Sequence, residues 1–164
     1  MPEVQITNPL GSFGYDTADN TTYLDSFGNP WAYPQRYVYL RANDTILKYD
    51  AVALVAATAA NPLSVEKLDV SDAMSVTAFI GVAQLAAVAG DMVKVVTAGF
   101  TLANWDSTDP VFGSAVGEGA ADGQLGAVLV GALDSTIIEV SIFGVALDVE
   151  TSADIAPIWL YGRY

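Results

Sequence analysis

The chain has 164 residues, of which 52% are hydrophobic and 15% charged, and its formal net charge is −13 at pH 7. This length suits one domain with extensions, and this apolar content excludes a disordered chain. An acidic surface neither releases counterions from nucleic acid nor attracts anionic lipid, so we expect no nucleic acid and no membrane among the partners.

The first 36 residues predict an extended arm. They are rich in Asn, Gly, Pro and Thr, show no sustained hydrophobic period and carry many aromatic rings. Such rings are costly to leave in water, so we expect the arm to lie on its own domain, on a neighbouring copy or on a larger partner. The arm residues expected to make contacts are Phe13, Tyr15, Tyr23, Phe27, Trp31 and Tyr33.

Residues 37–149 predict a β domain. It begins with a short aromatic strand at residues 37–40 (YVYL), and β-prone residues continue at 45–49 and 51–55. The alanines that follow could equally start a helical turn before Asn61-Pro62 ends it. Residues 61–75 are the most polar part of this domain and predict a surface loop.

Residues 79–99 predict a β-hairpin around which the rest of the domain is organised. Its hinge is Ala89-Gly90-Asp91, where glycine supplies a positive φ and aspartate a local hydrogen bond. Residues 76–85 are expected to form its first arm, and the β-branched residues from Val93 onward its second.

A similar pattern recurs about 45 residues later, with Gly126 in the place of Gly81 and Gly144 in the place of Gly99. It predicts a second hairpin, with strands at residues 124–133 and 136–143 closed by Asp134-Ser135. We therefore expect one sheet built from similar hairpins.

The segment between these hairpins predicts loops. Residues 101–110 expose Trp105 among turn formers, residues 111–112 form a brief strand, and turns follow at 117–119 and 122–123. The tail, residues 150–164, becomes polar and then aromatic. Because aromatic residues are enriched at interfaces, we expect Trp159, Tyr161 and Tyr164 to make contacts as well.

The residues that would carry chemistry are few. The chain has no cysteine and no histidine, which removes disulfides, thiolate metal sites and the commonest general base. Carboxylates are paired within three turn-rich stretches, where we interpret them as turn or solvated groups, with calcium binding as the next alternative and catalysis as the last. We expect no enzyme, cofactor or metal site. These pairs are Asp69 with Asp72, Asp106 with Asp109, and Glu118 with Asp122.

Glycines and valines set the pattern of the domain: residues 80–83 (IGVA), the Ala89-Gly90-Asp91 turn before VKVV, residues 113–119, and Leu125-Gly126 leading to IEV at 138–140. In this pattern the chain resembles the capsid cement, or decoration, proteins of tailed bacteriophages. The resemblance implies a small β-barrel or β-sandwich, here with an extended N-terminal arm, on the outer surface of the virion capsid. It also implies the major capsid protein as partner, a homotrimer or other homo-oligomer, and no catalysis.

Two hypotheses of function follow from different classes of protein. The first is a non-enzymatic decoration protein that stabilises an assembled phage head through its aromatic ends. The alternative is a host-surface or glycan-binding module of a head fibre or adhesin, in which Trp105 and its neighbouring loops form a sugar-stacking platform. An enzyme would need a clustered carboxylate pair in a deep pocket.

Overall fold

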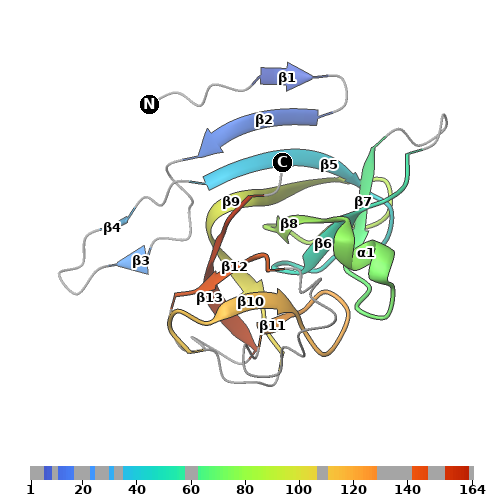
Figure 1. Cartoon of the computed structure of the whole chain (residues 1–164). Helices are drawn as coiled ribbons and strands as arrows, with labels where there is room; N and C mark the ends of the chain where they lie inside the picture. Colours follow the sequence, from blue (N-terminus) through green and yellow to red (C-terminus); the bar gives the residue numbers. More distant parts are fainter. Residues whose placement is uncertain are drawn as a thin grey trace.

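The computed structural model describes residues 6–8, 11–16, 23–24, 30–31, 35–57, 63–106, 111–128, 142–147 and 154–162, with side chains from residue 35 onward. β-strands dominate these residues, and α1 (Ala73–Thr77) is the one helix among them (Figure 1). The predicted all-β fold class is confirmed.

Five strands close a small barrel in the order β5–β7–β6–β8–β9. The ring closes because β5 pairs with β9 as well as with β7. The β5–β7 pair is parallel and the other pairs are antiparallel. Because β7 pairs with β5 only at Arg41 and Ala42, the first half of β5 keeps a free edge in the ring. The strands are β5 (Gln35–Ala42), β6 (Ala51–Leu54), β7 (Ser64–Lys67), β8 (Phe79–Ala83) and β9 (Met92–Asn104).

Small aliphatic side chains fill the barrel. Along β5, Val38 and Leu40 point inward while Tyr37 and Tyr39 belong to the core outside the barrel, which is the alternation expected of a strand with two buried faces. The other buried residues of the interior are Ala42, Ile46, Val52, Val65, Ile80, Ala83, Ala87, Val93 and Val95.

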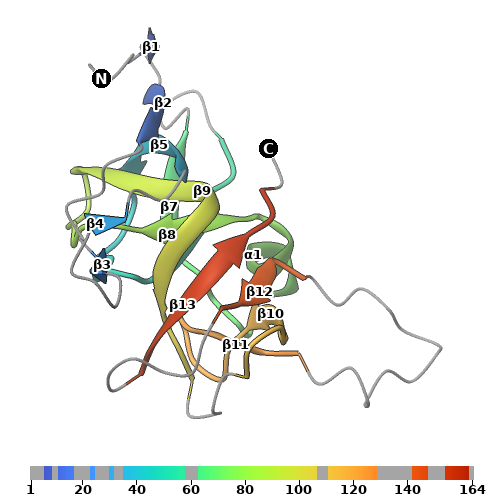
Figure 2. The same cartoon turned by 90° about the vertical axis from the view of Figure 1, so that its left-hand side faces the viewer.

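A second sheet covers one outer side of the barrel. β9 is 13 residues long, so it leaves the barrel and continues beside β13, which is followed in order by β12, β10 and β11. Figure 2 shows β13 and the end of β9 crossing in front of the barrel. The strands are β10 (Ala115–Glu118), β11 (Leu125–Ala127), β12 (Gly144–Ala146) and β13 (Ile155–Leu160).

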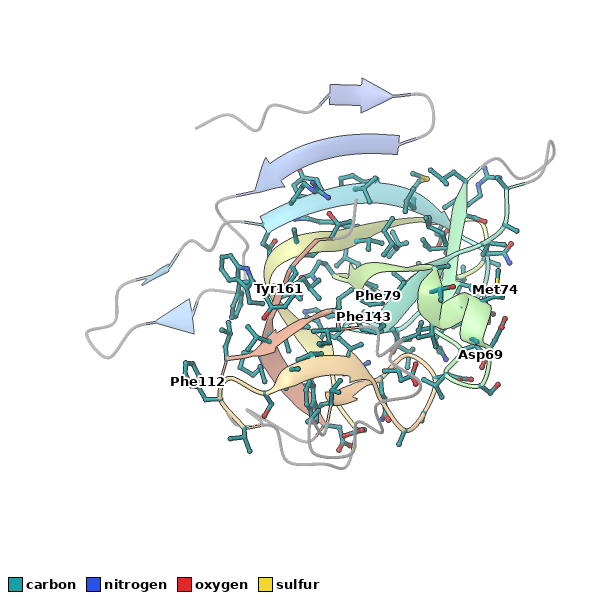
Figure 3. All side chains as sticks on the ribbon, in the orientation of Figure 1. Asp69, Met74, Phe79, Phe112, Phe143 and Tyr161 are labelled. Atoms are coloured by element: carbon teal, nitrogen blue, oxygen red, sulfur yellow. The ribbon has the colours of Figure 1, made fainter. Side chains whose placement is uncertain are left out.

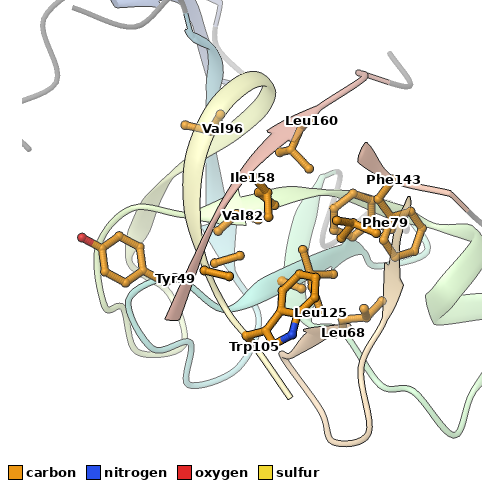
Figure 4. Packing of buried hydrophobic residues seen from close by; sticks show 14 of the residues in the cluster. Tyr49, Leu68, Phe79, Val82, Val96, Trp105, Leu125, Phe143, Ile158 and Leu160 are labelled. Carbon is orange, nitrogen blue, oxygen red and sulfur yellow. The ribbon is translucent and has the colours of Figure 1, made fainter. Parts of the chain in front are cut away.

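The main hydrophobic core lies between the barrel and this second sheet (Figure 4). Phe79 of the barrel stacks on Phe143 next to β12, with ring centroids 3.9 Å apart and planes 16° apart. Trp105, Leu125 and Ile158 are fully buried in the same cluster. The protein is thus a barrel with a sheet packed on it, combining the two architectures that the sequence left open.

The N-terminal strands extend the barrel sheet outward. β2 (Gly11–Asp16) pairs antiparallel with β5, β1 (Ile6–Asn8) pairs with β2, and β3 (Tyr23–Leu24) pairs with β4 (Pro30–Trp31) in a separate ribbon (Figure 1). The sheet order begins at β1. The predicted arm therefore contains strands.

The predicted central hairpin is correct in pairing and wrong in its connection. β8 and β9 are antiparallel, with Val82 opposite Val96. Gly90 has φ 98°, in a turn that the Asp91 N–H closes by donating to the Val88 carbonyl at 3.0 Å. The connection nevertheless spans residues 84–91 instead of a tight turn, because its middle pairs with the loop before β6 through the bridge between Ile46 and Ala87.

The polar segment predicted as a loop at residues 61–75 contains β7 and most of α1. Asp72 caps this helix by accepting from the Met74 N–H at 2.9 Å, so residues 76 and 77 are helical instead of belonging to the hairpin's first arm. Val65 of β7 is fully buried in the barrel. These two elements are short and have only a few apolar residues each, so their composition resembles that of a loop.

The Gly-rich segment also departs from prediction in part. Residues 111–112 are not a strand, because Phe112 lies in a turn, and Gly117 and Glu118 lie in β10 instead of a turn. The turn at Asp122-Gly123 is confirmed, with φ 78° at Gly123. The first strand of the second hairpin is present as β11, paired with β10, whereas residues 129–141 lie outside the described residues.

Candidate contact surfaces

The contact residues predicted from sequence fall into two groups. In the tail, Trp159 on β13 is 37% exposed and Tyr161 is 59% exposed. In the arm, Phe13 and Tyr15 take their places in β2, Tyr23 in β3 and Trp31 in β4. Their side chains, and the whole of Phe27, Tyr33 and Tyr164, lie outside the described residues.

Strand alternation gives the second sheet an apolar outer face. Thr101 and Ala103 of β9, and Ile158 of β13, are buried toward the barrel. Their neighbours along each strand point the other way and meet in register, Trp159 opposite Phe100 and opposite Val145. We call this side of the sheet the outer face; it carries Phe100, Leu102, Val145, Ile155, Pro157 and Trp159. Phe100 and Pro157 are buried, and Leu102 and Ile155 pack against the main core, so Trp159 is the most exposed of the six.

Two exposed side chains in the loop before β10 were missed by the sequence analysis. Val111 is 62% exposed and Phe112 74%. Their loop is fixed to β12, because the Gly113 N–H donates to the Ala146 carbonyl at 2.8 Å. Figure 3 shows Phe112 and Tyr161 on the same side of the molecule. The apolar composition of residues 111 and 112 is typical of a strand. They lie instead at a turn, where their side chains are exposed to solvent.

Charge is divided unequally along the sequence. The span from residue 95 to residue 162, which includes all of β10 to β13, holds nine of the 19 acidic residues and no lysine or arginine. The barrel segments instead carry five of the six basic residues: Arg36, Arg41, Lys48, Lys67 and Lys94. Of these nine acidic residues, only Asp106, Glu118, Asp122 and Asp154 are among the described residues.

The prediction for Trp105 is wrong. Its side chain is completely buried against the main core, and its backbone N–H donates to the Asp154 carbonyl at 2.6 Å. A bridge to Leu125 of β11 ties the same residue to the far end of the sheet. A fully buried indole offers no face to a sugar, so Trp105 is not a stacking platform.

The carboxylate pairs mostly serve local structure. Asp69 accepts hydrogen bonds from the Ser71 hydroxyl and the Ser71 N–H, which lower its pKa below the ordinary value, and Asp72 caps α1. Asp122 accepts from the Val70 N–H at 3.1 Å, and Asp106 is buried. Asp109 lies outside the described residues. Within the part of the chain that the structure describes, no three acidic residues gather as metal ligands would.

Asp50 is the one acidic side chain whose burial clearly raises its pKa among the described groups. Desolvation is the main cause, opposed by hydrogen bonds from the Leu47 N–H and the Asn104 side-chain amide, each at 2.8 Å. The carboxyl thereby ties the loop before β6 to the end of β9. It also lies against Gly123, where a Cβ would approach the Asp50 Oδ1 to 2.9 Å.

Among the described residues, no helix has both the length and the apolar character to cross a membrane.

The similarity of this chain to known proteins is limited to its fold. No protein-family model matches the chain, and no curated protein matches it. Its fold is similar to a solved structure described as the head fiber gp8.5 N base in bacteriophage phi29, with 14% identity, a TM-score of 0.48, and coverage of 76% of this chain and 92% of that one. At this TM-score the similarity adds no argument about function.

Proposed function

We propose that this protein is a non-enzymatic structural component of a phage head that binds the outer surface of the assembled shell and stabilises it. The expected partner is the major capsid protein, and the expected arrangement is a homotrimer or another homo-oligomer on the virion surface. The pattern of glycines and valines shared with capsid decoration proteins is the basis of this proposal in the sequence.

The observation that carries it in the structure is the arm. β1 and β2 add two strands to the outer side of β5, and in the described residues β1 pairs with β2 alone. Its other edge presents backbone donors and acceptors, which is how strands are added from a neighbouring chain. This edge supports an arm that pairs with a neighbouring chain on the shell.

Weak contacts of this kind suffice on a symmetric shell. Each copy adds a modest free energy, and repetition over many positions raises the overall hold on the shell without a strong single site.

Deletion of the arm tests the proposal on heads of the encoding phage that lack this protein. Removing residues 1–34 keeps Gln35, which is buried and donates its side-chain amide to the Phe100 carbonyl at 2.8 Å. A second variant without residues 1–10 removes β1 and keeps β2 on β5. We expect both deletions to lower occupancy on heads, measured by densitometry of purified particles.

Circular dichroism and urea unfolding of both variants are the controls for folding. Unchanged occupancy after either deletion would show that the removed strands make no contact with the shell. A full-length protein that leaves heads undecorated would refute the proposed function itself.

The glycan-binding alternative is not proposed, because the burial of Trp105 removes the platform on which it was based.

A further inference from the structure

Two loops at one end of the barrel are equivalent in structure. The first loop joins β5 to β6 (residues 43–50), and the second loop joins β8 to β9 (residues 84–91). They lie against each other at Ile46 and Ala87, where each backbone N–H donates to the other residue's carbonyl at 2.9 Å. An approximate two-fold axis between these residues relates the loops, because the same contacts recur on either side of it.

These recurring contacts begin in the backbone. In the first loop, Tyr49 has φ 72° and its N–H donates to the Ala83 carbonyl at 2.8 Å. In the second loop, Gly90 has φ 98° and its N–H donates to the Ala42 carbonyl at 2.8 Å. A positive φ is rare for a residue as bulky as tyrosine, so this conformation is required by the loop and not only permitted by glycine.

An aspartate closes each loop. Asp50 Oδ2 accepts from the Leu47 N–H at 2.8 Å, and Asp91 Oδ2 accepts from the Val88 N–H at 3.4 Å. The two loops therefore present a carboxylate and backbone carbonyls in equivalent positions.

The end of β9 lies on the first loop. Asn104, the last residue of β9, donates its backbone N–H to the Tyr49 carbonyl at 2.9 Å. Its side-chain amide donates to the Lys48 carbonyl at 3.2 Å and to Asp50 Oδ1 at 2.8 Å. One asparagine thus serves three acceptors. In the second loop the equivalent acceptors are exposed and receive no hydrogen bond from the described residues: the carbonyls of Ala89 and Gly90, and Asp91 Oδ1.

Exposed aliphatic side chains surround these acceptors of the second loop. Leu85 and Val88 of that loop, Met92 directly after it and Leu47 of the first loop are each more than half exposed. Large apolar side chains that gather in this way mark a site of interaction. The second loop therefore favours a polypeptide segment that offers a side-chain amide, as Asn104 does to the first loop, together with apolar side chains.

The N-terminal arm has this composition. Residues 1–34 carry several aromatic rings, and they include three of the chain's six asparagines: Asn8, Asn20 and Asn29. The arm of the same copy joins the barrel elsewhere, because β2 pairs with β5 on the edge opposite β9 (Figure 1). β1 lies three strand spacings from β9, or about 14 Å along the sheet. The arm of a neighbouring copy is free of this constraint.

Charge also favours a second copy at this end of the barrel. Copies of a protein with a net charge of −13 repel one another over most of their surfaces. The two loops and the end of β5 instead carry two exposed cations and two exposed carboxylates: Arg41, Lys48, Asp44 and Asp91. All four charged residues of the arm, residues 1–34, are acidic. Arg41 and Lys48 are therefore complementary to the arm.

We propose that the second loop is a docking site for the arm of a second copy of this chain, with an asparagine of that arm donating to Asp91 and to the Ala89 carbonyl. The inference rests on the proposed function, in which the protein acts as a homo-oligomer, and it names the surface through which the copies meet. Arm and loop are different surfaces, so the contact is head-to-tail and can close into a ring such as a trimer.

Sedimentation of the full-length protein and of two variants tests this site. Asp91→Ala removes the carboxylate, and deletion of residues 1–34 removes the arm. We expect each change to weaken self-association about tenfold or more, which is the contribution of a hydrogen bond to a charged group. Asp91→Asn keeps one acceptor oxygen and should weaken it less. The matched control is Glu118→Ala, which removes an exposed carboxylate from β10 and should change nothing.

Mixing the two defective variants guards against a loss of fold. The Asp91→Ala protein has an intact arm, and the arm-deleted protein has an intact second loop. Neither should associate with itself, whereas their equimolar mixture should form a complex of one copy of each. Urea unfolding of each variant is the second check on folding.

The possible results separate this inference from the proposed function. An unchanged protein that sediments as a monomer at every concentration overturns the inference, as does self-association that survives Asp91→Ala or a mixture that forms no complex. Any of these results leaves decoration of heads standing, provided that the unchanged protein still binds them. Self-association of a protein that leaves heads undecorated overturns the proposed function and keeps the docking site.

Discussion

Replacing Trp105 by alanine should destabilise the protein severely, because the structure buries this side chain completely between the barrel and the second sheet. A buried tryptophan removes roughly 200 Å² from water, and about 25 cal/mol per Å² converts this area to about 5 kcal/mol. The unfolded chain already buries part of that surface. We therefore expect a loss of about 3–5 kcal/mol in the free energy of unfolding, as is usual for Trp→Ala in a core.

Urea unfolding followed by circular dichroism measures this loss. The midpoint should fall while the dependence on urea stays the same, since the substitution changes stability and not the extent of unfolding. Phe112→Ala is the control: its ring is 74% exposed, and its removal should cost less than about 0.5 kcal/mol.

A loss below about 1 kcal/mol for Trp105→Ala would refute the reasoning. Such a result would mean that the indole is not packed in the core, and the sugar-stacking hypothesis would regain its basis. Because a small domain has a total stability of about 5–15 kcal/mol, the predicted loss is large enough to separate the two cases.

Three further substitutions test particular contacts, each by urea unfolding. Gly81→Ala should lower the free energy of unfolding by about 1–3 kcal/mol, because a Cβ there would collide with the Val96 carbonyl oxygen. This loss should exceed that of Gly90→Ala, where φ is 98° but the space around a Cβ is open. Tyr37→Phe should raise the free energy of unfolding by about 1 kcal/mol, since the buried Tyr37 hydroxyl has no hydrogen-bond partner in the described part of the chain. A decrease of the same size would show that the hydroxyl is hydrogen-bonded. Burial raises the pKa of Asp50, so the folded state holds this proton more tightly than the unfolded state. Its contribution to stability is complete below the unfolded pKa and is lost as pH rises through the folded pKa, so Asp50→Asn should flatten the pH dependence across that window.

The sequence predicted those features that depend on neighbouring residues. The aromatic, β-prone residues 37–40 identified the strand that became β5, and the glycine at position 90 identified a turn with positive φ. Both signals are local, because strand propensity and backbone conformation depend on the residue itself and its neighbours. The all-β architecture was predicted because strand and turn signals of this kind recur along the chain.

The wrong predictions concern features set by residues far away in the chain. Trp105 is surrounded in sequence by turn formers, yet its burial depends on Leu125 and on the strand that begins after Asp154. The outer face likewise exists only because β13 inserts between β9 and β12. Period-2 alternation shows that two faces differ, but it does not show which strand lies alongside or what covers each face. The register of distant strands therefore decided the burial of Trp105.

The closed barrel has a consequence for how this protein can bind anything. β7 pairs with β5 only at Arg41 and Ala42, so the first half of β5 has a free edge in the ring, and β2 pairs there. The described sheet therefore ends at β1 on one side and at β11 on the other. Strand addition relies on backbone hydrogen bonds along such an edge, so within the described residues β1 and β11 are the places where a strand of a neighbouring chain can pair.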